Sequence, residues 1–201
     1  MTLRARAIGL LVVTALLDAA PFSTALAQVS ATPIDACTLL DAADIHKVLG
    51  VPVEKGTRRD SGLESNGAYS SACVWMLESE RGLPKDPSAP LGGKSFVILN
   101  ALRYPQGSGG ARTYLEAFRE ASASGVLPAR PSARQFGDEA LWWGDGLAVR
   151  RRDVSFGISV FLQRAASTAT HGQPGEREGR LAKTILARLA AQDVTSGGTA
   201  K

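Results

Sequence analysis

The sequence has few of the residues that usually bind metals or attack substrates. It contains two cysteines and two histidines in 201 residues. A zinc site in a protein needs about three or four ligands from such side chains, and His46 and His171 lie far apart in the chain. Serines are frequent, but none stands in a G-x-S-x-G motif. The sequence therefore predicts no metal, no cofactor and no catalytic residue, and it favours a protein that is not an enzyme.

The sequence also has little net charge. It carries 23 lysines and arginines against 19 aspartates and glutamates, a formal net charge of +4 at pH 7. A charge of this size adds little to the long-range attraction of a partner. A nucleic-acid-binding domain concentrates many basic residues on one face, whereas the longest basic run here is Arg150, Arg151 and Arg152. We therefore expect no nucleic acid among its partners.

Long apolar runs are missing as well, apart from one at the N-terminus. The run Ala7–Leu17 has the length of a signal-peptide core and is too short to cross a bilayer, which takes about 20 apolar residues. Two arginines precede it, and the small-x-small sequence Ala25–Ala27 follows it. This order predicts a signal peptide over residues 1–27 that is cleaved after Ala27. The mature protein is expected to be soluble, to have no membrane span and to be periplasmic or secreted.

The domain organisation follows from this cleavage. The signal peptide takes two arginines and one aspartate with it, so 174 residues with a net charge of +3 remain. That length suits one domain with a hydrophobic core and is short for two. We expect a flexible lead-in over residues 28–35, a single domain over 36–192 and a disordered tail over 193–201.

Cys37 has four candidate roles: lipid-anchor site, reactive thiol, metal ligand or half of a disulfide. A lipoprotein signal places its cysteine directly behind the apolar core, but Cys37 lies ten residues beyond the predicted cleavage site, so no lipid anchor is expected. A reactive thiol would have to escape oxidation by Cys73, and a metal site would need further ligands. An even number of cysteines in an oxidising compartment favours a disulfide between Cys37 and Cys73. A disulfide that closes this 36-residue separation is expected to stabilise the folded protein by about 4 kcal/mol.

Three segments have the periodicity of amphipathic helices. The first begins at Asp41, a favourable N-cap with Asp44 in its first turn, and ends at Gly50, which suits a left-handed cap. The second follows the sequence PQGSGG, and the third covers residues 176–192. Their apolar stripes are Tyr114, Leu115, Phe118 and Ala121 in the second, and Leu181, Ile185, Leu186 and Leu189 in the third.

The other apolar segments predict strands. Asp145 and Gly146 are a strong hairpin signal between two of them, and Arg152 with Asp153 gives a weaker turn. The expected strands lie near 51–53 and over 71–77, 94–104, 141–143, 147–151 and 154–162. The predicted fold is α+β: an antiparallel sheet of five or six strands with helices packed mainly on one face.

Two adjacent tryptophans are the candidates for a ligand groove. Trp142 and Trp143 point to opposite faces of the same predicted strand. One is expected in the core, and the other is a candidate for lining a groove or a helix-covered face. Asp138 and Glu139 also point apart, so we expect them to mark a turn or bulge rather than to share a substrate.

Two further segments raise the question of an anionic ligand. The glycine-rich sequence GSGG at 107–110 lies before a helix, where backbone amides can hold an anion. It lacks the Lys-Ser/Thr of a P-loop, so a simple loop is the favoured interpretation. The arginine run 150–152 is interpreted as solvated residues at a strand edge, with an anionic partner as the alternative.

The order of several short motifs resembles a group of exported bacterial proteins of unknown function. These motifs are CTLLDAADIHKVLG, ACVW, FGDEALWW and REGRLAKTILARL, and they span Cys37 to Leu189. Many members of the group look like small lipoproteins or periplasmic proteins. The chain differs from them in having no lipid-anchor cysteine and in having Arg152 where a glycine often precedes Asp153. The resemblance implies no catalytic residues.

The sequence as a whole predicts an exported, non-enzymatic domain that binds a small ligand or a cell-envelope protein. Two alternatives stay open. One is a periplasmic hydrolase in which a Ser or Asp meets His46 or His171. The other is a structural accessory subunit of an envelope complex, whose sheet edge pairs with a partner strand.

Overall fold

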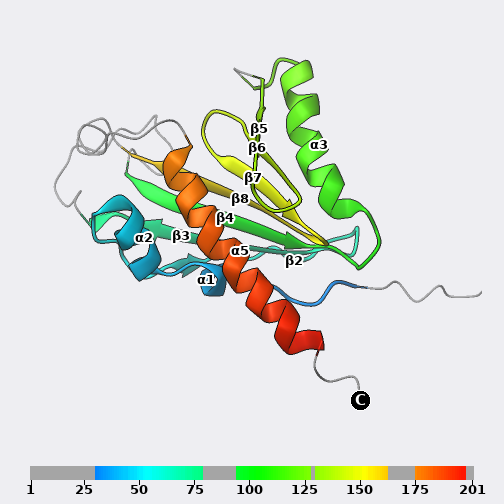
Figure 1. Ribbon diagram of the computed structural model, residues 1–201, viewed down its shortest axis with the longest axis horizontal. Helices are drawn as coiled ribbons and strands as arrows, with labels where there is room; N and C mark the ends of the chain where they lie inside the picture. Colours follow the sequence, from blue (N-terminus) through cyan, green and yellow to red (C-terminus); the bar gives the residue numbers. More distant parts are fainter. Residues whose placement is uncertain (1–29, 79–93, 128–129, 163–174, 198–201) are drawn as a thin grey trace, which may run out of the picture.

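The computed structural model describes residues 30–78, 94–127, 130–162 and 175–197. Over these residues the chain forms one antiparallel sheet of eight strands and four α-helices, which confirms the predicted α+β class (Figure 1). The predicted signal peptide over 1–27 lies outside the described residues. No helix in the described part of the chain is long and apolar enough to cross a membrane.

The sheet has the strand order β1-β3-β4-β8-β7-β6-β5, and β2 pairs with β3 beside this path. All of these pairings are antiparallel. The strands are β1 (Thr57–Arg58), β2 (Gly62–Leu63), β3 (Tyr69–Met76), β4 (Phe96–Arg103), β5 (Ser132–Arg134), β6 (Glu139–Trp142), β7 (Leu147–Arg151) and β8 (Val154–Phe161).

The strand count exceeds the predicted five or six because three strands are very short. β1, β2 and β5 contain two or three residues each, too few for an alternating pattern to appear in the sequence. The strand expected near 51–53 is reduced to a single bridge between Val53 and Leu77. The predicted hairpin at Asp145 and Gly146 is confirmed, since β6 and β7 pair on either side of it.

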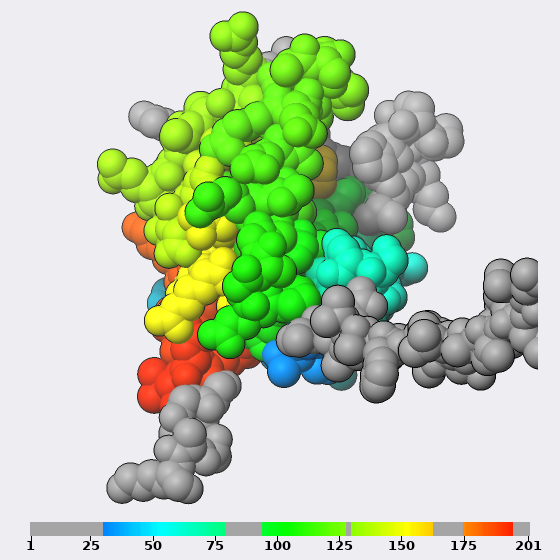
Figure 2. Space-filling view, turned by 90° about the vertical axis from the view of Figure 1, so that its right-hand side faces the viewer, coloured from blue at the N-terminus to red at the C-terminus, as the bar shows by residue number. Residues whose placement is uncertain are grey.

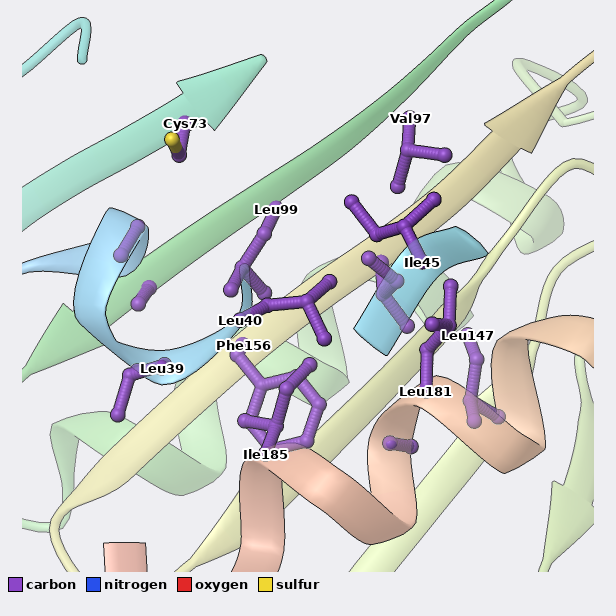
Figure 3. Packing of buried hydrophobic residues seen from close by; sticks show 14 of the residues in the cluster. Leu39, Leu40, Ile45, Cys73, Val97, Leu99, Leu147, Phe156, Leu181 and Ile185 are labelled. Atoms are coloured by element: carbon purple, nitrogen blue, oxygen red, sulfur yellow. The ribbon is translucent and has the colours of Figure 1, made fainter. Parts of the chain in front are cut away.

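The central strand β4 is paired along its whole length on both sides. Each of its eight residues lies opposite one residue of β3 and one of β8. Side chains alternate between the two faces of a strand, so every second residue enters the same layer. Val97 and Leu99 of β4 and Phe156 and Ile158 of β8 are fully buried in the main hydrophobic core (Figure 3). Each such burial stabilises the fold by about 1.5–3 kcal/mol.

Three of the helices cover the face of the sheet that carries this core. They are α1 (Ala36–Leu39), α2 (Ala42–Leu49) and α5 (Glu176–Gly197), and α5 crosses the strands obliquely (Figure 1). Their buried residues in the core are Leu39 of α1, Ile45 and Leu49 of α2, and Leu181, Ile185 and Leu189 of α5.

The helix α3 (Gly110–Ala123) lies on the opposite face, over β7 and β8 (Figure 2). Its Leu115 forms a separate cluster with Leu141 of β6 and Ala148 of β7. Three of the four described helices thus lie on one face, in line with the predicted packing mainly on one face, and α3 covers part of the other. The side chains of β7 alternate between the two faces of the sheet, so its apolar residues Leu147 and Ala148 point into opposite layers. Each of these layers is covered by helix.

The caps of α2 are those that the sequence predicts. The Asp41 side chain accepts a hydrogen bond from the Asp44 amide at 2.9 Å, and the Asp44 side chain accepts one from the Asp41 amide at 3.2 Å. Gly50 ends the helix with φ of 73°, a left-handed conformation that glycine adopts without steric cost. Arg188 of α5 donates to the Asp41 carboxylate at 2.7 Å, so the capped end of α2 is also tied to α5.

The predicted disulfide between Cys37 and Cys73 is present. It joins α1 to β3, with the two Cα atoms 5.2 Å apart, and Cys73 is fully buried. Gly56 passes close over this bridge. A Cβ atom at Gly56 would lie 2.7 Å from the Cys73 sulfur and 2.6 Å from Nε1 of Trp75. The disulfide, Trp75 and the chain at Gly56 therefore form one tightly packed layer.

Both ends of the domain contain more structure than the sequence predicts. The lead-in 28–35 is predicted to be flexible, but Ile34 is buried and the Ala31 amide donates to the Gly67 carbonyl at 2.9 Å. The last helix is predicted to end at Gln192 and the disordered tail to begin at Asp193, but α5 continues to Gly197. Within this extension, the carboxylate of Asp193 lies 2.9 Å from Arg151 and 3.1 Å from Arg152.

The disulfide should carry a large part of the stability. We expect a Cys37→Ala/Cys73→Ala double variant to lose about 4 kcal/mol of unfolding free energy, because the unfolded chain regains the entropy of an open 36-residue loop. Urea denaturation of both proteins measures this difference. The wild-type protein with a reductant is the control and should unfold at the same urea concentration as the variant. A loss below about 1 kcal/mol would contradict the expectation.

A buried glutamate should make stability depend on pH. Glu178 lies in the first turn of α5 with 6% of its surface exposed. Burial raises the pKa of Glu178, and hydrogen bonds from its own amide and that of Val160 oppose the rise only in part. The folded protein therefore holds the Glu178 proton more tightly than the unfolded chain does.

Protonated Glu178 contributes its full stabilisation of the folded state below the pKa of glutamate in the unfolded chain, about 4.3. This stabilisation is lost as the pH rises through the higher pKa that Glu178 has in the folded protein. We expect Glu178→Gln to remove this loss, so that the variant gains stability over the wild type as the pH rises above about 4.3. Urea denaturation at a series of pH values tests it. Glu116→Gln, on the exposed side of α3, is the control and should follow the wild-type profile. A Glu178→Gln profile parallel to wild type would refute the role of Glu178.

Candidate ligand-binding site

The two tryptophans point to opposite faces of the sheet, as their adjacency predicts. Trp142 packs against the main core and against Gly175, where a Cβ atom would lie 3.0 Å from its ring. Trp143 stacks on Phe118 of α3 with ring centroids 4.7 Å apart. Both side chains thus contact protein, and neither lines the cavity described next. A ligand role for Trp142 or Trp143 stays a prediction.

A cavity of about 840 Å³ lies at the end of the sheet where β4 stops and β7 turns into β8. Its walls come from the loop 105–109, the first turn of α3, the residues 192–193 of α5 and Thr32 of the N-terminal segment. Figure 1 shows the connection from β4 into α3 at this end of the sheet. The charged residues of the lining are four arginines and two aspartates: Arg103, Arg112, Arg150, Arg152, Asp153 and Asp193.

Two of these arginines are already paired with carboxylates. Arg150 lies 3.1 Å from Asp138 and 3.5 Å from Glu139, and Arg152 lies 3.1 Å from Asp193. The sequence interpretation placed the run 150–152 at a strand edge, but β7 lies between β6 and β8. These arginines are therefore not edge residues; they bind the carboxylates of Asp138 before β6, Glu139 at the start of β6 and Asp193 of α5.

The other two arginines have no carboxylate partner in the described part of the chain. Arg103, the last residue of β4, donates to Thr32 Oγ1 at 3.2 Å and to Gln192 Oε1 at 3.4 Å, and both of these acceptors are neutral. Arg112 is exposed in the first turn of α3 and forms no ion pair with any described residue. The cavity therefore contains two guanidinium charges that no carboxylate of the described residues compensates.

The start of α3 adds to the positive potential of the cavity. The N-terminus of a helix carries a partial positive charge, and acidic side chains usually compensate it. The first turn of α3 contains no acidic residue and instead places Arg112 there. The N-cap Gly109 has φ of 76° and provides no side-chain acceptor; nearby, Ser108 Oγ accepts from the Gly110 amide at 3.3 Å. An anion in the cavity would stabilise this helix end.

The glycines before α3 also have a structural role, as the sequence interpretation expects. Gly109 adopts a left-handed conformation that disfavours other residues. A Cβ atom at Gly110 would lie 2.3 Å from the ring of Tyr104, so the helix can begin here only without a side chain. Burial raises the pKa of Tyr104 above its ordinary value. The loop therefore sets the distance between α3 and the end of β4.

Asp138 and Glu139 both bind Arg150, although the sequence predicts that they point apart. Asp138 lies before β6 and also accepts a hydrogen bond from the Arg152 amide at 2.6 Å, so it marks the turn that the sequence predicts. Glu139 begins β6 and pairs with Arg119 of α3. The hydrogen bond from Arg119 holds the pKa of Glu139 below its ordinary value. Glu139 therefore stays ionised and keeps the charge of Arg150 compensated.

The two histidines of the hydrolase alternative are not seen together. His46 is exposed on α2, and His171 lies outside the described residues, so this alternative stays a prediction. Within the described ranges, no group of three or more His, Cys, Asp or Glu side chains is placed to hold a metal ion.

The cavity contains residues that the sequence interpretation did not select. Arg103 and Arg112 each lie one residue outside the segment PQGSGG, beyond Tyr104 and Ala111, and this flanking by two basic residues is the pattern in the sequence that could have revealed them. Asp193 was assigned to a disordered tail, and Thr32 to a flexible lead-in. Their contribution depends on tertiary contacts that no local pattern encodes.

Comparison with known protein families, with curated proteins and with solved structures finds no match to this chain. The resemblance to exported bacterial proteins therefore stays a prediction, and the site has to be interpreted from its own chemistry.

The backbone conformation of Arg152, in the turn beside the cavity, can be tested by substitution. Arg152 has φ of 53°, a left-handed conformation that costs a non-glycine residue about 1–2 kcal/mol. We expect Arg152→Gly to be about 1 kcal/mol more stable than Arg152→Ala, because both lose the side chain and only glycine relieves the strain. Thermal and urea unfolding of the two variants measure the difference. Equal stability, or a more stable alanine variant, would show that the turn is not strained.

Proposed function

We propose that this protein is an exported, soluble and non-enzymatic domain that binds a small anionic ligand in the cavity at the end of its sheet. The observation that carries the proposal is the pair of uncompensated arginines, Arg103 and Arg112, in the cavity lining. Guanidinium groups bind carboxylate and phosphate oxygens through charge-assisted hydrogen bonds, often two at a time.

The size and shape of the cavity support a small molecule as the ligand. Binding sites for such ligands are concave and commonly have volumes of about 300–1,000 Å³. The cavity has about 840 Å³, which is within this range. Its backbone segment 105–109 adds polar groups to the arginines. For these reasons we favour a small ligand over a cell-envelope protein, which the sequence leaves as the other candidate.

The position of Arg112 is a further argument for an anion. A cation in the first turn of a helix faces the positive end of the helix dipole, which costs roughly 0.3–1 kcal/mol. Nothing in the described chain offsets this cost, because α3 begins without an acidic side chain. A bound anion would interact favourably with both the helix end and the guanidinium group.

The disulfide supports the proposed export. Disulfides persist in oxidising compartments such as the bacterial periplasm and the extracellular space, and they are rare in the cytosol. The Cys37–Cys73 bridge is buried against the core and ties α1 to β3, so the fold includes it as a structural element.

Removing the two uncompensated arginines should abolish anion binding. Inorganic phosphate and glutarate are suitable probes, because they present the two common kinds of anionic group. We expect both to bind the wild-type protein in an NMR titration and to raise its Tm, and we expect added salt to weaken them. The Arg103→Ala/Arg112→Ala variant should bind each probe at least about tenfold more weakly, which corresponds to 1.4 kcal/mol.

The matched control is Arg134→Ala, which removes an exposed arginine from the edge strand β5, outside the cavity. This variant should bind phosphate and glutarate as the wild type does. The proposal fails if neither probe binds the wild-type protein, or if Arg134→Ala weakens binding as much as the double variant does.

A further inference from the structure

The cavity also contains an acidic residue, Asp153, whose carboxylate forms no ion pair with any described residue. Asp153 lies in the turn between β7 and β8, and its backbone carbonyl accepts a hydrogen bond from the Tyr104 amide at 2.8 Å. This bond fixes the residue at the end of β4. The side chain of Asp153 is half-buried and forms no hydrogen bond or ion pair with any described residue.

The neighbouring acidic residues differ from Asp153 in this respect. Asp138 and Glu139 are paired with Arg150, and Asp193 is paired with Arg151 and Arg152. These pairs leave uncompensated charge of both signs in the cavity: the carboxylate of Asp153 and the guanidinium groups of Arg103 and Arg112.

The uncompensated arginines lie on the two sides of the sheet end. Arg103 contacts Gln192 of α5, on the face of the main core. Arg112 belongs to α3, which covers the other face. Asp153 is in the turn at the same end of the sheet and is bonded to Tyr104, the residue that follows Arg103. All three residues line the same cavity, so a ligand that fills it meets charged groups of both signs.

We propose that the ligand is a small zwitterion, which carries carboxylate or phosphate groups for Arg103 and Arg112 and an ammonium group for Asp153. The inference rests on the proposed function of the cavity. A ligand with anionic groups alone would bury the Asp153 carboxylate without a partner and would be repelled by it. An ammonium group removes both penalties. Asp153 is therefore the residue that selects amino-bearing anions over simple anions.

Two matched pairs of probes test this selection. L-glutamate differs from glutarate by its ammonium group, and 2-aminoethyl phosphate differs from ethyl phosphate in the same way. NMR titration of the full mature protein gives an affinity for each probe. We expect the ammonium-bearing member to bind roughly two- to fivefold more tightly in at least one pair, the contribution of a partly exposed ion pair. The pair that shows the preference identifies carboxylate or phosphate as the anionic group.

The variant Asp153→Asn should remove this preference and should bind glutarate or ethyl phosphate more tightly than the wild type does. Its side chain has no hydrogen bond or ion pair to any described residue, and asparagine has nearly the same size, so the variant is expected to fold. The control Asp145→Asn, in the hairpin between β6 and β7, should keep the wild-type preference.

The results separate this inference from the proposed function. Suppose that the wild type binds glutarate or ethyl phosphate through Arg103 and Arg112 but shows no preference for the ammonium-bearing probes. The proposal of a zwitterionic ligand is then wrong, whereas the proposed anion-binding site is supported. The same holds if Asp153→Asn leaves the preference unchanged. If the wild type binds none of the four probes, both the inference and the proposed function fail.

Discussion

The structure depends on the antiparallel pairing of β4 with β3 on one side and β8 on the other. These two ladders keep eight residues of β4 in register with both neighbours, and the register decides which side chains enter the main core. The same register ends β4 at Arg103, opposite Val154 at the start of β8. The turn with Arg152 and Asp153 thus lies directly beside Arg103, so the sheet that forms the core also positions the charged end of the molecule.

Charge matching distinguishes this end from an ordinary polar surface. Exposed ion pairs contribute little to stability, typically below about 1 kcal/mol each, so their number is a weak argument for any role. Their distribution is more informative. Arg150 and Arg152 have carboxylate partners, whereas Arg103 bonds only to neutral oxygens and Arg112 faces the positive end of its own helix. An uncompensated cation beside a concave surface is the arrangement that a bound anion would complete.

The sequence predicts the elements that rest on local chemistry. The caps of α2 follow from the residue types at Asp41 and Gly50, and the Cys37–Cys73 bridge follows from cysteine count and predicted compartment. Strands of two or three residues exist only through their pairing with β3 or β6, so no periodicity reveals them. The cavity could not be predicted because its residues come from four separate parts of the chain: Thr32, 103–112, 150–153 and 192–193. Beyond Gln192, Asp193 of α5 likewise pairs with arginines that lie 41 and 42 residues earlier in the sequence.

The most direct measurement is an NMR titration that follows the arginine Nε–Hε signals of the mature protein as inorganic phosphate is added. The account predicts that the signals of Arg103 and Arg112 shift together with one saturation curve, while the signal of Arg134 on β5 stays in place. It is contradicted if Arg103 and Arg112 do not shift, or if all exposed arginines shift alike, because phosphate would then bind no particular part of the surface.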